Sequence, residues 1–311
     1  MTHAHIDTGA LLRLGRALLD AGYRFSTVTP STRRRVNGRA GNSRAHDLRG
    51  VFGWGRPFIE GTLPAAIVQH MQDAGVLAHS GHGLRSTVRA TTLNGRLYFH
   101  TAGPDDDAVF FGPDTVRFIG ATLRAAAQLD APSRIVEVGC GAGPAAIELA
   151  LRFPGAEVIA TDVNRHALTL AQVNAQLAGA RIATRESDVL ASVEGEFDVA
   201  VSNPPYILDT EQRTYRHGGG MLGAELSVRI ATQGLARLRP GGALLLYTGV
   251  AMTGPDDPFL AALRPALEQQ CDFWDYEELD PDIFGEQLNQ PGYEEAERIA
   301  AVFLTARKRM R

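Results

Sequence analysis

Three glycines at alternating positions form the pattern in this sequence that is best suited to ligand chemistry. Gly139, Gly141 and Gly143 follow an apolar run at 135–138 and precede a helix-like stretch at 144–150. Glycine lets the backbone turn sharply and lets a ligand approach without a Cβ in the way. The free N–H groups of a helix N-terminus then face that ligand. The pattern predicts a strand, a tight turn and a helix that together hold a ligand.

Two acidic residues narrow the choice of ligand. Glu137 lies two positions before Gly139, and Asp162 follows the apolar run 157–161, which we expect to be the next strand. A carboxylate at the tip of that strand can hold both hydroxyls of a ribose. A dinucleotide fingerprint is disfavoured because Pro144 stands where it needs glycine or alanine. A glycine turn of some other α/β protein is the plain alternative.

The second chemical stretch is Asn203-Pro204-Pro205-Tyr206, which follows an expected strand at 197–202. Neither proline has an N–H group, so both end the ladder and fix a rigid turn with free carbonyls. Asn203 adds an amide acceptor, and Tyr206 adds a flat face for stacking. Fixed acceptors of this kind can hold a planar NH₂ group and aim its lone pair at an electrophile. The alternative is a Pro-Pro turn beside a core tyrosine.

Together these motifs resemble a known family. The glycine turn is similar to motif I of class I S-adenosylmethionine (SAM) methyltransferases, and Asn203–Tyr206 to motif IV of the amino-methyltransferases. Within that group, residues 108–311 resemble the HemK-like release-factor glutamine methyltransferases. Pro113-Asp114-Thr115 is similar to that family's Pro-Glu-Thr stretch. The chain departs from the family at two places. Gly112 stands where the family has an arginine, and residues 215–220 stand where the family has a Glu-Pro motif.

The resemblance implies a role for each matching residue. Asn203, Pro204, Pro205 and Tyr206 would hold the acceptor nitrogen. SAM, which leaves as S-adenosylhomocysteine, would be bound by Phe111, Pro113, Thr115, Glu137, Gly139, Cys140, Gly141, Ala142, Gly143, Asp162, Val163, Asn164, Asp188, Val189 and Asn203. In that set, Glu137 and the glycine turn would face the methionine part of SAM. Asp162 would bind its ribose, and Asp188 or Val189 would contact its adenine. Tyr206, Tyr215, Arg216 and His217 would contact the substrate. Three of these residues also have an alternative without a role in binding. Phe111 would then lie in the core, Asp188 would cap a helix, and His217 would be an exposed loop residue.

The spacing of apolar runs predicts the architecture that positions these residues. Seven runs alternate with helical patterns, at 134–138, 157–161, 181–186, 197–202, 242–248, 273–279 and 298–306. Such repeats indicate a doubly wound, mostly parallel, Rossmann-like α/β sheet with helices on both faces. We place this domain at residues 106–311. Residues 1–105 predict a smaller, winged-helix-like domain of helices plus a hairpin that turns at Asn94-Gly95.

Composition restricts the class of protein. No apolar run reaches the roughly 18 residues of a membrane span, and the first residues lack a secretory pattern. Two cysteines give neither a disulfide framework nor metal spacing, so we expect a cytoplasmic protein without metal. The first 100 residues hold 13 arginines against five acidic residues, although the net charge is −4. This basic region indicates recognition of a macromolecule, either a nucleic acid or a protein, or only the codon bias of a GC-rich genome.

These observations leave several functions open. The first is SAM-dependent N-methylation of a planar amide, amine or guanidine nitrogen, either of a protein glutamine or of a nucleic acid. The second is the same chemistry on a small metabolite, with the N-terminal region as a lid or a dimer arm. A nucleotide-binding regulator without activity is a third. An NAD-dependent oxidoreductase is disfavoured by Pro144. No membrane partner is expected, and a homodimer is possible.

Overall fold

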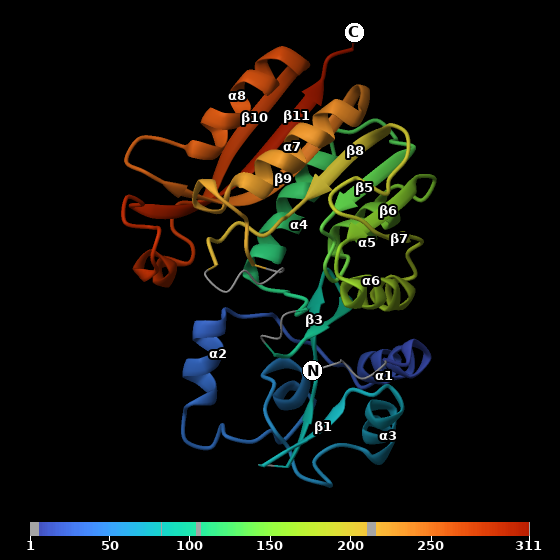
Figure 1. Ribbon diagram of the computed structural model, residues 1–311. Helices are drawn as coiled ribbons and strands as arrows, with labels where there is room; N and C mark the ends of the chain where they lie inside the picture. The colour runs from blue at the N-terminus through green and yellow to red at the C-terminus, as the bar shows by residue number, and fades with distance from the viewer. Residues whose placement is uncertain (1–5, 82, 104–106, 210–215, 311) are drawn as a thin grey trace.

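The C-terminal two thirds of the molecule is built around a seven-stranded sheet (Figure 1). The computed structural model describes residues 6–81, 83–103, 107–209 and 216–310. The strand order in the sheet is β10-β11-β9-β8-β5-β6-β7. The strands are β5 (Arg134–Val138), β6 (Glu157–Asp162), β7 (Ala183–Glu186), β8 (Phe197–Ser202), β9 (Leu238–Met252), β10 (Cys271–Asp280) and β11 (Arg298–Lys308).

The sheet is parallel except at one strand. β5 pairs in parallel with β6 and β8, β6 with β7, and β8 with β9. β11 is antiparallel to both β9 and β10. The chain therefore winds outward from β5 in one direction, returns to β8 and winds outward in the other. The mostly parallel seven-stranded sheet is confirmed, and its order reverses between β5 and β8, where ligands of such sheets bind.

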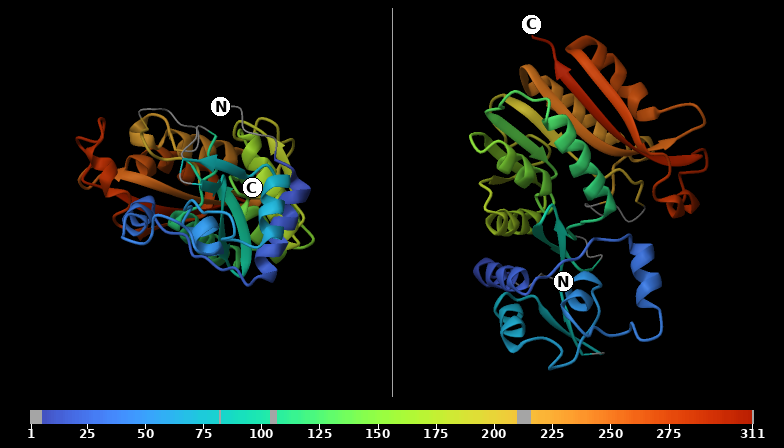
Figure 2. Two further views of the ribbon diagram at one scale, coloured as in Figure 1. Left: turned by 90° about the horizontal axis from the view of Figure 1, so that it is seen from below. Right: turned by 180° about the vertical axis from the view of Figure 1, so that it is seen from behind.

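Helices cover both faces of the sheet, as the alternating pattern predicted. Apolar side chains of α4, α5 and α6 form a core on one face, and those of α7 and α8 form a core on the other. Figures 1 and 2 show α7 and α8 on the side opposite to α4. The helices are α4 (Pro113–Ala126), α5 (Pro144–Arg152), α6 (Arg165–Ala178), α7 (Glu225–Arg237) and α8 (Pro258–Gln270). Two short 3₁₀ turns are η2 (Met221–Gly223) and η3 (Gly285–Asn289).

The N-terminal region combines short helices with two hairpins. Thr29 caps α2, and the β3–β4 hairpin turns at Asn94-Gly95, as predicted. The β1–β2 hairpin was not predicted, because its strands are only four residues each and one of them contains Gly83. The elements are α1 (Thr8–Asp20), α2 (Pro30–Asn37), the π-helical turn η1 (Arg49–Gly53), α3 (Ala65–Asp73), β1 (Leu77–Ser80), β2 (Gly83–Ser86), β3 (Val88–Leu93) and β4 (Arg96–Thr101).

The β3–β4 hairpin packs against the sheet domain instead of projecting as a wing. The Asn174 side chain on α6 accepts a hydrogen bond from the Phe99 N–H at 2.8 Å and donates one to the Phe99 carbonyl at 3.0 Å. Apolar residues of α5 and α6 also join the N-terminal core. The strands of this hairpin are largely buried, so the hairpin contributes to the packing between the N-terminal region and the sheet domain. The expected domain boundary at 105/106 lies outside the described residues.

Candidate active site

The two predicted motifs lie side by side at the carboxyl ends of β5 and β8. Val138 and Ser202 are register partners in these neighbouring parallel strands. The Ser202 hydroxyl donates a hydrogen bond to the Val138 carbonyl at 2.7 Å, which fastens the two strand ends together. Gly139 and Asn203 are the next residues of the two strands. The glycine turn and the Asn-Pro-Pro-Tyr turn therefore leave the sheet together at the point where its strand order reverses.

The three glycines of the turn serve different purposes. All three have positive φ, at 67°, 51° and 79°, a region that favours glycine. A Cβ at Gly139 would meet no atom within 4 Å, so this residue borders open space. A Cβ at Gly143 would lie 2.9 Å from the Ala171 Cβ, so this glycine permits close packing of α5 on α6. Cys140 and Ala142, between the glycines, are buried, which leaves the turn's backbone to meet a ligand.

Glu137 is buried beneath the turn, with 2 % of its surface exposed. Its Oε2 accepts a hydrogen bond from the Ala146 N–H at 2.7 Å, in the first turn of α5. Burial raises the Glu137 pKa to about 8, against the opposing effect of hydrogen bonds from Ala146 and Ala145. The carboxylate therefore caps α5 and supports the turn from below. This geometry places Glu137 behind the turn instead of on its open side.

Asp162 lies at the end of β6, next to the glycine turn, as predicted. Its Oδ2 accepts a hydrogen bond from the Gly141 N–H and its Oδ1 one from the Asn164 N–H, both at 2.9 Å. Burial raises its pKa, and these backbone donors act in the other direction. The next side chain, Val163, is 46 % exposed, which is unusual for valine. Together they form a half-buried acid beside an open apolar surface at the rim of the turn.

Asn164 has a structural task in this geometry. Its side chain caps α6 by accepting hydrogen bonds from the N–H groups of His166 and Ala167. Its amide nitrogen donates to the Asp107 carbonyl at 2.7 Å, which ties the segment that leads into α4 to the end of β6. Both the oxygen and the nitrogen of the Asn164 side-chain amide are therefore hydrogen-bonded, and the side chain positions the rim of the site.

Asp188 and Val189, at the turn after β7, differ in burial. The Asp188 carboxylate is exposed and forms an ion pair with Arg229 of α7. Val189 is buried and adopts φ 51°, which is rare for a β-branched residue. Its carbonyl accepts a hydrogen bond from the Thr161 hydroxyl at 3.4 Å. A strained backbone next to a candidate ligand site is a common functional feature, and here it occurs at Val189 and not at Asp188.

The residues expected before and at the start of α4 prove mainly structural. Phe111 is buried, with its ring 5.3 Å from that of Tyr98 and 5.6 Å from that of His100. It therefore lies in the N-terminal core instead of over an adenine, which is the alternative that the sequence left open. Pro113 is the first residue of α4, and the Thr115 hydroxyl accepts a hydrogen bond from the Gly112 N–H at 3.2 Å. Both residues begin the helix.

Tyr206 is buried and not available for stacking, with 8 % of its surface exposed. Its hydroxyl lies near Asp114 of α4, which accepts a hydrogen bond from Tyr247 at 2.9 Å. A Cβ at Gly249 would lie 2.4 Å from the Tyr206 ring, so the ring rests against that backbone. Burial and the neighbouring Asp114 raise the Tyr206 pKa well above its ordinary value. The tyrosine anchors the turn, and Asn203 and Pro204 remain as the candidate acceptors.

The chain after Tyr206 folds back over the turn. The Ile207 N–H donates to the Arg216 carbonyl at 3.1 Å, and the Gly218 N–H donates to the Ile207 carbonyl at 2.9 Å. His217 Nδ1 accepts a hydrogen bond from the Asp209 N–H at 3.2 Å, and Arg216 bonds to Gln287. Two of the four predicted substrate residues, Arg216 and His217, therefore hold the segment that starts at residue 216 against the Asn-Pro-Pro-Tyr turn; we call this segment the returning loop. Tyr215, the third, lies outside the described residues.

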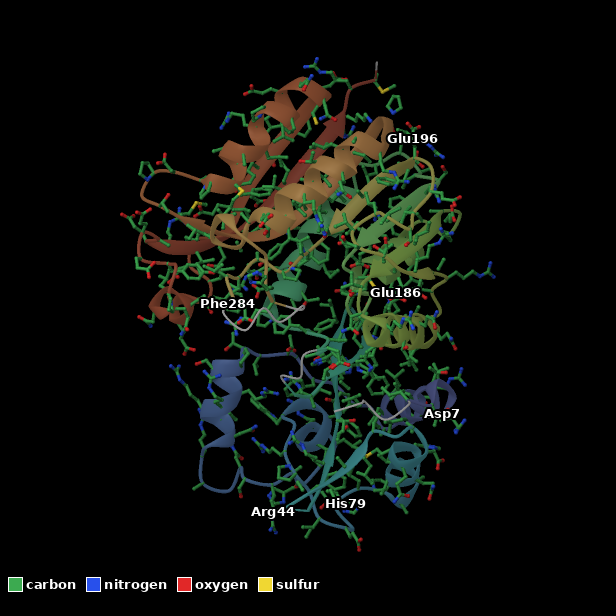
Figure 3. The ribbon with its side chains drawn as sticks, viewed as in Figure 1. Asp7, Arg44, His79, Glu186, Glu196 and Phe284 are labelled. Atoms are coloured by element: carbon green, nitrogen blue, oxygen red, sulfur yellow. The ribbon has the colours of Figure 1, made fainter. Side chains whose placement is uncertain are left out.

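Several residues that shape this site were not predicted from the sequence. Asp114 and Tyr247 anchor Tyr206, while Gly218 and Gly223 pack against its backbone. Phe284, which Figure 3 labels at the edge of the sheet domain above α2, has its ring 6.1 Å from that of Tyr206. The run of glycines at 218–220 was a signal for close packing, whereas nothing local marked Tyr247 or Phe284.

Two further observations concern the described residues as a whole. No helix among them is long and apolar enough to span a bilayer. In the same part of the chain, no three His, Cys, Asp or Glu side chains gather as a metal site would require. Cys140 and Cys271 are both buried free thiols.

Known proteins are similar to the region that contains this site. Residues 119–252 match the family model of the methyltransferase small domain. The release factor glutamine methyltransferase of Deinococcus radiodurans is 35 % identical over 144 residues, covering 43 % of this chain and 51 % of that protein. The Chlorobaculum tepidum protein of the same name is 42 % identical over 133 residues, covering 40 % of this chain and 42 % of that protein.

Solved structures are similar at a lower level. A methyltransferase from Pyrococcus furiosus aligns with a TM-score of 0.43 and 21 % identity, over 65 % of this chain and 89 % of that one. The chain spans about half the length of the curated relatives it matches. The matched residues 119–252 hold both turns at the β5–β8 edge. These residues therefore form a HemK-like methyltransferase domain, similar to that of the release factor glutamine methyltransferases.

Proposed function

We propose that this protein is a SAM-dependent N-methyltransferase that acts on a planar nitrogen. The observation that supports this most directly is the register of β5 and β8, which places Gly139 next to Asn203. One turn offers an open, Cβ-free edge, and the other offers rigid carbonyl acceptors. Lining up two reactants in this way supplies much of the acceleration that a transfer reaction needs.

The residues around the glycine turn fit SAM. Gly139 borders open space, Asp162 stands at the rim with its carboxylate, and Val163 offers an exposed apolar surface for the adenine. When bound, SAM would supply a methyl group on a positively charged sulfur. In our proposal Asp162 accepts hydrogen bonds from the ribose hydroxyls, Val189 faces the adenine, and the backbone of 139–143 holds the methionine part. Glu137 supports that backbone from below.

Asn203 and Pro204 would hold the acceptor nitrogen. The Asn203 side-chain carbonyl and the Pro204 backbone carbonyl each accept one hydrogen of an NH₂ group, which directs its lone pair away from the turn. Pro205 and the buried Tyr206 keep the turn rigid, since the Tyr206 ring packs closely against the backbone at Gly249. Rigid acceptors stabilise the positive charge that develops on the nitrogen without having to reorganise.

The amide of a protein glutamine is the acceptor that the similar proteins favour, because two of them are named for that substrate. The match to the family model begins at residue 119, after the arginine-rich region of this chain. A nucleic acid is therefore the second candidate. A small metabolite as acceptor, a cytoplasmic location, a homodimer and the division into domains at 105/106 remain predictions.

The proposal is tested first by binding and transfer. We expect S-adenosylhomocysteine to bind in a calorimetric titration, and tritium from methyl-labelled SAM to enter an acceptor in a fractionated bacterial lysate. Protease treatment of the lysate should remove the acceptor if it is a protein, and ribonuclease or deoxyribonuclease should remove it if it is a nucleic acid. An absence of both binding and transfer would contradict the proposed function.

Asn203→Ala separates catalysis from cofactor binding. We expect this variant to keep its affinity for S-adenosylhomocysteine within about threefold and to lose roughly 10²–10³ in turnover, as for removal of one transition-state hydrogen bond. Asn289→Ala, at an exposed asparagine of η3, is the matched control and should leave both quantities unchanged. Unchanged turnover in Asn203→Ala would refute the role assigned to Asn203.

A further inference from the structure

Arg89 of β3 is a buried cation with no anionic partner among the residues that the structure describes. The residue is 7 % exposed, and its Nε has no hydrogen-bond partner. Burial lowers the Arg89 pKa to about 10, Arg33 lowers it further, and only Tyr23 acts in the other direction. No described carboxylate is among the groups that act on it. Burying an unpaired charge is costly, and proteins normally pair such groups or use them to bind ligands.

Arg33 of α2 brings a second guanidinium to the same place. A Cβ at Gly55 would lie 3.7 Å from the Arg89 Cδ and 3.9 Å from the Arg33 Nη1, so the two side chains converge over this glycine. Arg33 donates one long hydrogen bond, of 3.4 Å, to the Ala102 carbonyl. Its pKa is lowered by burial and then by Arg34 and Arg85. Both guanidinium groups therefore lie in cationic surroundings.

The nearby histidine does not compensate these charges. His100, the register partner of Arg89, is buried, and its Nε2 lies 3.1 Å from the Thr91 hydroxyl. Its pKa is held well below its ordinary value, first by burial and then by Arg89 and Arg33. The ring is therefore neutral at physiological pH. Two positive charges remain over Gly55, in a part of the chain that lies outside the family match at 119–252.

We propose that Arg89 and Arg33 bind a phosphate group, between α2, the turn at Gly55 and the segment at Ala102. Guanidinium groups suit phosphate because they donate two parallel hydrogen bonds to its oxygens. A phosphate with up to two negative charges matches two cations better than a single carboxylate does. The methionine end of SAM is a poor candidate, because its ammonium and sulfonium groups would add positive charge. This phosphate site near Gly55 is separate from the proposed methyl-transfer site at the β5–β8 edge.

The phosphate can belong to a small molecule or to a nucleic-acid backbone. Exposed arginines continue from this site along and just beyond α2, at positions 34, 35 and 39. Figure 1 shows α2 on the outside of the N-terminal region, below the segment that ends in η3. Arg34 of this helix reaches Glu286 of η3 at 3.3 Å. The Arg34 end of this cationic strip therefore lies beside η3, on the side of the sheet domain that carries Phe284 and Tyr206.

Arg89→Met and Arg33→Met test the site, with Arg44→Met as the matched control. Arg44 is an exposed arginine, which Figure 3 shows at the foot of the molecule. Binding of inorganic phosphate, of a nucleoside 5′-monophosphate and of a single-stranded RNA oligomer is measured by calorimetry at fixed ionic strength. We expect at least one of the three probes to bind the wild type and to bind each of the two site variants at least tenfold more weakly. Arg44→Met should retain most of the affinity for phosphate.

Thermal stability and cofactor binding complete the test. Without ligand, Arg89→Met should melt at the same temperature as the wild type or higher, because it removes an unpaired buried charge. Affinity for S-adenosylhomocysteine should be unchanged. Binding of RNA in competition with phosphate would identify a nucleic-acid backbone as the source, and phosphate binding without RNA binding would identify a small molecule.

Three results would overturn the site. These are no binding of any of the three probes to the wild type, equal losses in Arg89→Met and Arg44→Met, or a loss of S-adenosylhomocysteine affinity with phosphate binding intact. The last result would assign the arginines to the cofactor's carboxylate. None of these measurements requires methyl transfer, so an inactive enzyme would leave the conclusion about phosphate unaffected.

Discussion

At the scale of single residues, the candidate site uses buried carboxylates to hold its own backbone. Glu137 accepts a hydrogen bond from the start of α5, and Asp162 accepts two from the glycine turn and the loop after β6. Burial raises the pKa of each of these carboxyl groups. The turn is therefore shaped before a ligand arrives, which reduces the conformational cost of binding.

The raised pKa of Glu137 gives a testable dependence of stability on pH. Burial moves it from 4.5 to about 8, so between these values the folded state binds a proton more tightly than the unfolded chain does. Raising the pH through this window therefore removes stability. Glutamine does not titrate, so Glu137→Gln should not lose this stability. The free energy of unfolding of Glu137→Gln minus that of the wild type should therefore increase from pH 5 to pH 8.

Urea denaturation at pH 5, 6.5 and 8 measures that difference. Glu196→Gln, at an exposed glutamate that Figure 3 labels at the far edge of the sheet domain, is the matched control. A difference between Glu137→Gln and wild type that stays flat or shrinks with rising pH would show that folding does not raise the Glu137 pKa.

At the scale of elements, the loop that returns over the Asn-Pro-Pro-Tyr turn depends on glycine. A Cβ at Gly218 would lie 2.0 Å from the Gly223 carbonyl oxygen and 2.7 Å from the Tyr206 Cα, and neither backbone atom can move freely. Gly218→Ala should therefore displace the loop and lower turnover by about tenfold or more, since small misplacements of a reacting group cost about that much. Affinity for S-adenosylhomocysteine should be retained.

Gly220→Ala is the control for this element. A Cβ there would meet only the Glu225 carboxylate at 3.1 Å, at the end of a flexible side chain. Steady-state turnover and calorimetry on both variants separate the acceptor side of the site from the cofactor side. Equal turnover in the two variants would mean that the returning loop does not position the acceptor.

At the scale of the whole molecule, one buried acid links the N-terminal hairpin to the sheet domain. Glu148 of α5 accepts hydrogen bonds from Arg96 at 2.9 and 3.1 Å and from the Tyr98 hydroxyl at 3.0 Å. Glu148→Gln should lower the free energy of unfolding by about 1.5–3 kcal/mol, the range for a hydrogen bond to a charged group. Urea denaturation followed by circular dichroism measures the loss.

An exposed ion pair serves as the comparison. Glu278 and Arg298 lie 2.9 Å apart on β10 and β11, and each is more than a third exposed. Glu278→Gln should cost less than about 1 kcal/mol, because solvent screens such pairs. If Glu148→Gln cost no more than this control, the contact between hairpin and sheet domain would be weaker than its burial indicates.

The sequence by itself determined the order of the elements and the two turns at the candidate site. The glycine turn, the cap at Thr29, the start of α5 at Pro144 and the hairpin at Asn94-Gly95 depend on backbone preferences of the residues themselves. Strand and helix periods are also local, which is why all seven strands of the sheet were predicted to within a few residues. Placing two motifs at adjacent strand ends followed from the topology of a doubly wound sheet.

Only the tertiary structure decided which of those side chains are free to meet a ligand. Phe111 and Tyr206 are buried, and Thr115 and Asn164 are used as helix caps, although all four lie in chemically suggestive positions. Arg89 showed no local signal, yet it is the buried cation without a described anionic partner. Burial and partner choice depend on which faces of distant elements meet, and that information is not contained in any short stretch of sequence.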